Sequence, residues 1–71
     1  WPQEALDYFL KAEAIESGFW LKNQLNIAKC YMQIKDVAKA KEWLQKIAAG
    51  QLVTAEDRDV AAEAKTLLAK L

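Results

Sequence analysis

The chain has 71 residues, of which 54% are hydrophobic and 28% are charged, and its ten basic side chains balance ten acidic ones. This is the composition of a small globular domain and not of a disordered segment. A net charge of zero lacks the basic excess on which nucleic-acid binding depends, so we expect no nucleic-acid partner. No apolar run approaches the ~20 residues that span a bilayer, so no membrane insertion is expected in this segment.

The sequence has few of the residues that usually support catalysis or metal binding. The chain has no histidine and one cysteine, Cys30, so the thiol has no imidazole to activate it. Cys30 falls in an apolar helical pattern, and we expect a small buried hydrophobic residue in a reducing compartment. Acidic pairs such as Asp57 with Asp59, or Glu13 with Glu16, are assigned to helix ends and polar faces. We expect no enzyme, no metal and no cofactor.

Two helices are predicted in the first half of the chain. The first runs from about residue 2 to 16, because Pro2 suits a first helical turn and Ser17-Gly18 ends the pattern. The second runs from about residue 20 to 34. The expected apolar residues of the first helix are Ala5, Leu6, Phe9, Leu10, Ala12 and Ile15, and those of the second are Leu21, Leu25, Ile27, Ala28, Tyr31, Met32 and Ile34.

Two more helices follow in the second half. Asp36 is a plausible N-cap for a helix from about residue 37 to 49, which Gly50 ends. Thr54 and Asp57 resemble a capping box and predict a helix after residue 54. The expected apolar residues are Val37, Ala40, Trp43, Leu44 and Ile47 in the third helix, and Val60, Ala61, Ala64, Leu67, Leu68 and Leu71 in the fourth.

Part of the pattern repeats after 35 residues. Ala5, Phe9 and Ala12 of the first helix recur as Ala40, Leu44 and Ile47 of the third. Self-similarity near this period is typical of helix-turn-helix solenoids. The small–large–small set, together with Ile27-Ala28-Tyr31 in the second helix, resembles the tetratricopeptide repeat. The fold class we predict is all-α, with four helices in antiparallel hairpins stacked as a tetratricopeptide-repeat-like right-handed solenoid.

The repeat phasing predicts one fragment over residues 1–71. Residues 1–17 would be the second helix of a partial repeat, residues 20–50 a complete repeat, and residues 54–71 a C-terminal capping helix. The match departs from the repeat pattern at Gln24 or its neighbours, where a Trp is usual, and at Ile47, where a small residue is usual. The proline that usually ends a repeat is absent from both copies.

Several segments resemble one particular family. They are Ala5-Leu6-Asp7-Tyr8-Phe9-Leu10-Lys11-Ala12-Glu13, Phe19-Trp20-Leu21-Lys22-Asn23, Ala28-Lys29-Cys30-Tyr31 and Glu63-Ala64-Lys65-Thr66-Leu67-Leu68. They are similar to the C-terminal repeats of the regulator of microtubule dynamics family. The resemblance implies a cytoplasmic, non-enzymatic protein associated with microtubules and the spindle. Some relatives are attached to mitochondria or the endoplasmic reticulum by segments outside this region.

The expected binding surface is a concave groove lined by the second helix. Its predicted residues are Lys22, Leu25, Asn26, Lys29, Met32 and Gln33. Lysine and asparagine side chains there would bind a carboxylate of a partner peptide, and methionine would add an adaptable apolar contact. The alternative is that these residues form an ordinary solvated face.

A second expected surface is basic. Residues 22–46 contain six lysines and two acids, a net charge of +4. Lys35, Lys39 and Lys46 are predicted to share a side of the third helix and to meet an acidic peptide, the acidic tails of tubulin or anionic lipid headgroups. A solvated lysine face is again the plain alternative.

Two other functions stay open at this stage, and a contact between two copies of the chain is also predicted. The groove would bind a lipid or a small molecule if its apolar residues continued into further repeats, or the segment would be a purely structural cap of a longer array. The first helix would have an uncovered flank with Trp1 and Tyr8, and dimerisation through that flank is a prediction.

Overall fold

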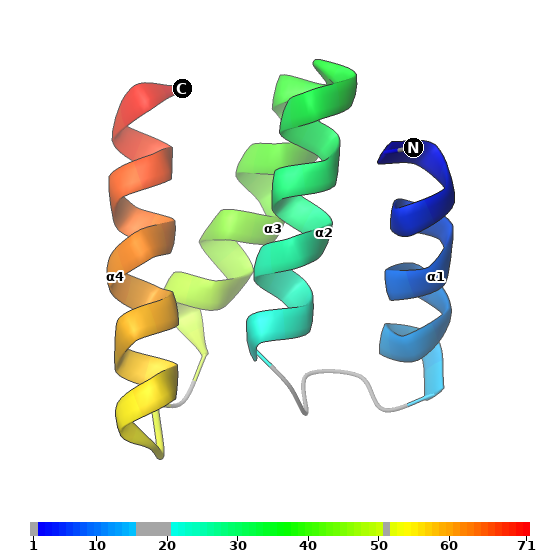
Figure 1. Cartoon of the computed structure of the whole chain (residues 1–71). Coiled ribbons are helices and arrows are strands. Elements are labelled where there is room, and N and C mark those ends of the chain that lie inside the picture. Colours follow the sequence, from blue (N-terminus) through cyan, green and yellow to red (C-terminus); the bar gives the residue numbers. More distant parts are fainter. Residues whose placement is uncertain (1, 16–20, 51) are drawn as a thin grey trace.

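The computed structural model of the chain describes residues 2–15, 21–50 and 52–71. Within these ranges the protein is all-α, with helices α1 (Pro2–Ile15), α2 (Leu21–Ile34), α3 (Val37–Ala49) and α4 (Ala55–Lys70). Successive helices run in opposite directions (Figure 1). The four predicted helices are therefore confirmed. The predicted helix ends at residues 16 and 20, the break at Ser17-Gly18 and the side chain of Trp1 lie outside the described residues.

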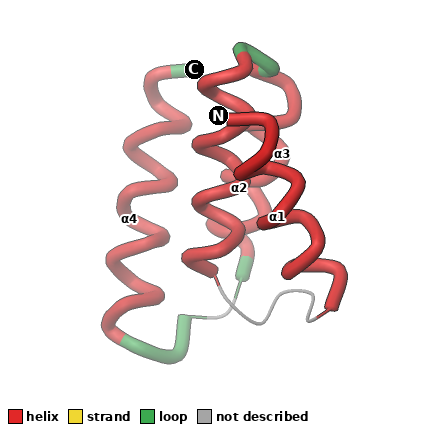
Figure 2. Tube along the Cα trace, turned by 45° about the vertical axis from the view of Figure 1, so that its right-hand side comes forward, coloured by secondary structure: helices red, strands yellow, loops and turns green. Residues whose placement is uncertain are grey.

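Helix α2 occupies the centre of the molecule. It packs against α1 on one side, against α4 on the other and against α3 behind, and α3 also packs against α4 (Figures 1 and 2). Among the described helices, the backbone of α1 approaches α2 but does not come within 8 Å of α3 or α4. The molecule is a flat body of 30 × 30 × 16 Å. One side of α2 is therefore not covered by any of the other described helices.

The larger hydrophobic core joins α2, α3 and α4. It contains Leu21, Leu25, Ala28, Leu44, Ile47, Val60, Ala61 and Ala64, with Leu67, Leu68 and Leu71 packed at its edge. Ala28 and Ala64 are fully buried, because small side chains let neighbouring helices approach closely. The apolar residues predicted for α4 are confirmed.

A smaller core holds α1 against α2. Leu6, Ile27 and Cys30 are buried there, and Ala5, Phe9, Leu10 and Tyr31 pack around them. Trp43 of α3 packs against both cores and so connects them. The expected burial of Cys30 is confirmed. Phe9, Tyr31 and Trp43 pack between the helices.

Local hydrogen bonds define the starts of α3 and α4 as the sequence predicts. The Asp36 carboxylate accepts a hydrogen bond from the backbone N–H of Lys39 at 3.2 Å. The Thr54 hydroxyl accepts from the backbone N–H of Asp57 at 3.1 Å, and the Asp57 carboxylate accepts from the backbone N–H of Thr54 at 3.2 Å. This reciprocal pair satisfies two of the otherwise unpaired N–H groups of a helix start. Gly50 ends α3, with its N–H donating to the carbonyl of Ile47.

Helix α2 ends at Ile34, as predicted, but the backbone conformation of the residue that follows was not predicted. Lys35 adopts a left-handed backbone conformation with φ of 70°. The N–H of Lys35 donates to the carbonyl of Met32, and the N–H of Asp36 donates to the carbonyl of Tyr31. This pair of bonds forms a Schellman motif, which glycine or asparagine usually completes because a Cβ atom is strained in that conformation. Here a lysine fills the position.

The structure corrects two side-chain placements on α1. Ile15, expected on the apolar side, has 82% of its surface exposed. Glu13, expected on a polar face, is buried at 9% exposure. The reason is that α1 contacts α2 along a line through Leu6 and Glu13, seven residues apart, and Ile15 falls outside that line. None of the described helices is long and apolar enough to cross a membrane.

Candidate protein-binding surface

Four polar side chains line the uncovered side of α2. They are Lys22, Asn26, Lys29 and Gln33, which we call the α2 strip. Their spacing of four, three and four residues puts them on one line along the helix. Lys22 and Gln33 are exposed, and Asn26 and Lys29 are half-buried. The sequence prediction placed all four together, and the structure does bring them onto one surface.

The ion pair of Lys29 ties the α2 strip to α4. Its ammonium nitrogen lies 2.6 Å from a carboxylate oxygen of Glu63, and the two side chains are 44% and 47% exposed. An ion pair this exposed contributes about 0–1 kcal/mol, because water screens the charges and two flexible side chains must be ordered. The carboxylate of a partner therefore competes with Glu63 for Lys29 at little cost.

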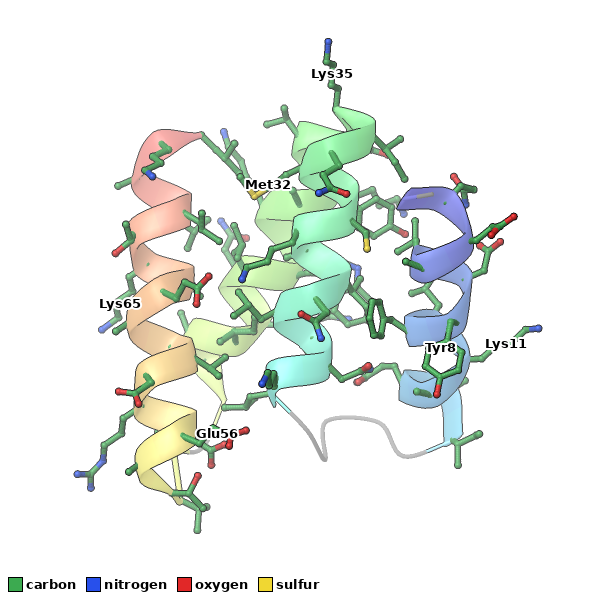
Figure 3. All side chains as sticks on the ribbon, viewed as in Figure 1. Tyr8, Lys11, Met32, Lys35, Glu56 and Lys65 are labelled. Atoms are coloured by element: carbon green, nitrogen blue, oxygen red, sulfur yellow. The ribbon has the colours of Figure 1, made fainter. Side chains whose placement is uncertain are left out.

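Leu25 does not belong to the predicted surface. It is only 3% exposed and packs in the larger core. The prediction was wrong because α4 lies against the side of α2 that carries Leu21, Leu25 and Ala28. Met32 is half-buried on the side of α2 that faces α4 (Figure 3). Of the two apolar residues expected in the groove, only Met32 has surface left for a ligand.

The three lysines predicted around α3 are all exposed. Lys35 lies in the turn before the helix and points away from the body (Figure 3), while Lys39 and Lys46 lie within α3. Glu42 is three residues after Lys39 and four before Lys46, so it occupies the same side and lowers the net positive charge there. The ammonium of Lys46 lies 4.2 Å from the ring centroid of Trp43, an orientation that favours a cation–π contact.

Two buried amide side chains fix α2 in its orientation. The side-chain amide of Asn23 donates a hydrogen bond to the carbonyl of Phe9 at 3.1 Å. The amide of Gln24 donates to the carboxylate of Glu13, also at 3.1 Å. Burying these groups unpaired would cost about 1–3 kcal/mol each, so the bonds select one rotation of α2 against α1. That rotation turns the α2 strip outward.

Sequence reasoning missed these amide contacts. The available signal was Gln24 at the position where the repeat usually has a Trp. A polar side chain in a buried interhelical position requires a partner. The sequence did not say which residue that partner is.

Two side chains of the described residues have a shifted pKa. Burial raises the pKa of the Cys30 thiol, because the thiolate is the form that loses hydration. The backbone N–H groups of Val53 and Thr54 lower the pKa of Asp57 below its usual 3.8, since both donate to the ionised carboxylate. The first shift makes Cys30 a poor nucleophile. The second shift results from the capping hydrogen bonds at the start of α4.

Residues 2–15, 21–50 and 52–71 contain no group of three His, Cys, Asp or Glu side chains placed to hold a metal ion. The polar side chains of the α2 strip are two amides and two lysines. Fold and surface together define an all-α domain of antiparallel helices that presents one polar side of its central helix.

The family follows from a comparison with known proteins. Residues 2–71 match the model of the family described as regulator of microtubule dynamics protein 1-3. The chain belongs to this family, and the predicted resemblance is confirmed. No solved structure matches the chain.

Individual relatives agree with that assignment. Regulator of microtubule dynamics protein 1 of Mus musculus is 38% identical over 69 residues, which cover 97% of this chain and 23% of the relative. The protein of the same name in Homo sapiens is 35% identical over 66 residues, covering 93% and 21%. Regulator of microtubule dynamics protein 2 of Bos taurus is 33% identical over 69 residues, covering 97% and 17%. The chain thus spans about a fifth of the length of these relatives.

Proposed function

We propose that this chain is a non-catalytic protein-interaction module of a microtubule-associated regulator of microtubule dynamics. Its place of action is then the cytoplasm, at microtubules and the spindle. The names of the relatives supply the microtubule part of the proposal. The surface of α2 supplies the interaction part.

The α2 strip is the observation that carries the proposal. Three sides of α2 are covered by the other helices, while the fourth presents Lys22, Asn26, Lys29 and Gln33 to solvent. A helix side with two ammonium groups and two amides offers donors for carboxylates and partners for a peptide backbone. The partner we propose is an acidic peptide segment, of which the tails of tubulin are an example.

The geometry also limits what the α2 strip does on its own. Lys29 is shared with Glu63, so Lys22 is the strip's lysine without an ion-pair partner among the described residues. A single free lysine and an exchangeable one give weak binding at physiological salt, because exposed charges are screened within about 8–10 Å. Weak contacts of this kind gain strength when several modules engage one filament.

A structural role for α4 is the second candidate, and one observation favours it. Val60, Ala61 and Ala64 of α4 are buried in the larger core. Its opposite side carries charged side chains such as Arg58 and Lys65, both exposed. A helix that is apolar toward the core and charged outward suits the end of a helical array. This capping role is compatible with binding through α2.

Co-sedimentation of the chain with stabilised microtubules tests the proposed function. Lys22→Glu should reduce the bound fraction, because it places a negative charge on the α2 strip. Lys65→Glu is the matched control, since it makes the same change of charge on the side of α4 that points away from α2 (Figure 3). A third variant, Lys39→Glu with Lys46→Glu, measures the contribution of α3. Circular dichroism of each variant verifies that the helices are intact.

The expected pattern is specific to the surface. Binding should fall several-fold for Lys22→Glu, stay near the unaltered level for Lys65→Glu, and drop steeply with added salt. Removing the acidic tubulin tails by limited proteolysis should abolish it. Equal loss for Lys22→Glu and Lys65→Glu, or binding insensitive to salt, would show that the α2 strip is not the binding surface.

A further inference from the structure

One side of α1 carries a second regular pattern, in which two large exposed residues alternate with two half-buried alanines. Ala5, Tyr8, Ala12 and Ile15 follow one another at spacings of three, four and three, the spacing of a coiled-coil seam. Tyr8 is 71% exposed and Ile15 is 82% exposed, while the two alanines are half-buried. We call these four residues the α1 seam. Large and small side chains alternate along it.

The α1 seam lies on a helix with one neighbour. Among the described helices, α1 packs only against α2. The ring of Tyr8 makes an edge contact with the ring of Phe9, with centroids 5.8 Å apart, and it lies on the face of α1 turned toward the viewer in Figure 3. An exposed tyrosine held in place by a neighbouring ring loses little entropy when a partner covers it.

Two charges flank the α1 seam, and they have opposite sign. Glu4 precedes Ala5, and Lys11 precedes Ala12, so the two charges are seven residues apart on the same side of the helix. Both side chains are exposed, and Lys11 points away from the body (Figure 3). When two such helices pair in opposite directions, Glu4 of each copy meets Lys11 of the other. In a parallel pair Glu4 would instead lie near Phe9 of the other copy, so no Glu4–Lys11 ion pair would form.

We propose that α1 pairs in antiparallel fashion with α1 of a second copy of this chain. The contact is isologous about a two-fold axis, so that Tyr8 of each copy packs over Ala5 of the other and two Glu4–Lys11 ion pairs form along one side of the seam. The charges of α1 select this occupant, because they complement themselves. One 14-residue helix per copy buries less than the ~1,000 Å² of a stable interface. The pairing is therefore weak and depends on concentration.

Charge exchange between two variants tests this pairing in the 71-residue chain. Glu4→Lys makes both flanking charges positive, and Lys11→Glu makes both negative. Each variant alone should lose self-association by about tenfold or more, because like charges then face each other. An equimolar mixture of the two should associate again, because one copy of each restores both ion pairs. Lys65→Glu, on α4, should behave as the unaltered chain.

Sedimentation velocity from about 10 µM to about 1 mM supplies the measurement. The proposal is overturned if the unaltered chain stays monomeric over that range. It is also overturned if the chain associates and neither single variant weakens the association. Failure of the mixture to exceed both variants overturns the antiparallel geometry. If a variant loses its helical signal, the NMR chemical shifts of the unaltered chain are measured as a function of concentration instead. Shift changes confined to residues 4–15 support the pairing. Shift changes elsewhere, or no changes, overturn it.

Discussion

Replacing Lys35 by glycine should stabilise the protein. The left-handed conformation of Lys35, with φ of 70°, costs an L-residue about 1–2 kcal/mol, because the Cβ atom crowds the following carbonyl oxygen. Glycine has no Cβ and avoids this cost. It also gives the unfolded chain more conformational entropy to lose on folding, which costs about 0.5–1 kcal/mol. The net gain expected for Lys35→Gly is therefore about 0.5–1 kcal/mol.

Thermal unfolding followed by circular dichroism measures this gain. For a domain of this size, it corresponds to a rise of about 2–8 °C in Tm. Lys35→Ala should leave Tm nearly unchanged, because alanine keeps the Cβ. Lys39→Gly should lower Tm, since Lys39 lies inside α3 and glycine costs about 1 kcal/mol within a helix.

The comparison of the three variants refutes the reasoning if Lys35→Gly fails to raise Tm above that of Lys35→Ala. That outcome would mean that the turn between α2 and α3 relaxes without strain. The same variant also bears on binding, because Lys35 is one of the predicted basic contacts. A protein that is more stable and yet binds microtubules less would separate the functional role of the lysine from its backbone role.

Other predictions concern the caps and the cores. Above its usual pKa of 3.8 the Asp57 carboxylate stabilises the fold, and this stability is lost as pH falls through the lowered folded-state pKa; in Asp57→Asn the difference in Tm between pH 7 and about pH 3 should shrink, and an unchanged difference would contradict the assignment. Gln24→Ala removes a buried donor to Glu13 and should cost about 1–3 kcal/mol in urea unfolding; a loss below 0.5 kcal/mol, roughly the size of a surface effect, would mean that water replaces the amide. Ile27→Ala, at a position with 0% exposure, should cost about 2–5 kcal/mol, whereas Ile15→Ala should cost less than about 0.5 kcal/mol; equal losses at the two positions would contradict the two cores described above.

The helices themselves were predictable because their signals are local. Apolar periodicity, Asp36, Gly50 and the Thr54–Asp57 pair each act over a few residues. The helices and their caps appear in the structure as expected, whereas Ile15, Ile34 and Val37 of the predicted apolar pattern are exposed. The strip of polar residues on α2 was predictable for the same reason, since helical spacing alone puts them on one line.

The errors arose where the rotation of one helix against another matters. Leu25 and Ile15 were misplaced because periodicity shows which residues share a side of a helix but not how far the neighbouring helix reaches around it. The buried pair of Gln24 and Glu13 could not be predicted, since it joins residues eleven apart on different helices. Lys35 was missed because its left-handed conformation comes from the tight connection between α2 and α3 and not from its own preference.

The single attachment of α1 has a consequence for the order in which the protein opens. Because α1 contributes only to the smaller core, it can detach and leave α2, α3 and α4 packed around theirs. Amide protons of α1 should then exchange with solvent through a sub-global opening of lower free energy than those of α2 and α3. Such an opening would also release the amides of Asn23 and Gln24, so anything that binds α1 slows exchange in the first turns of α2 as well.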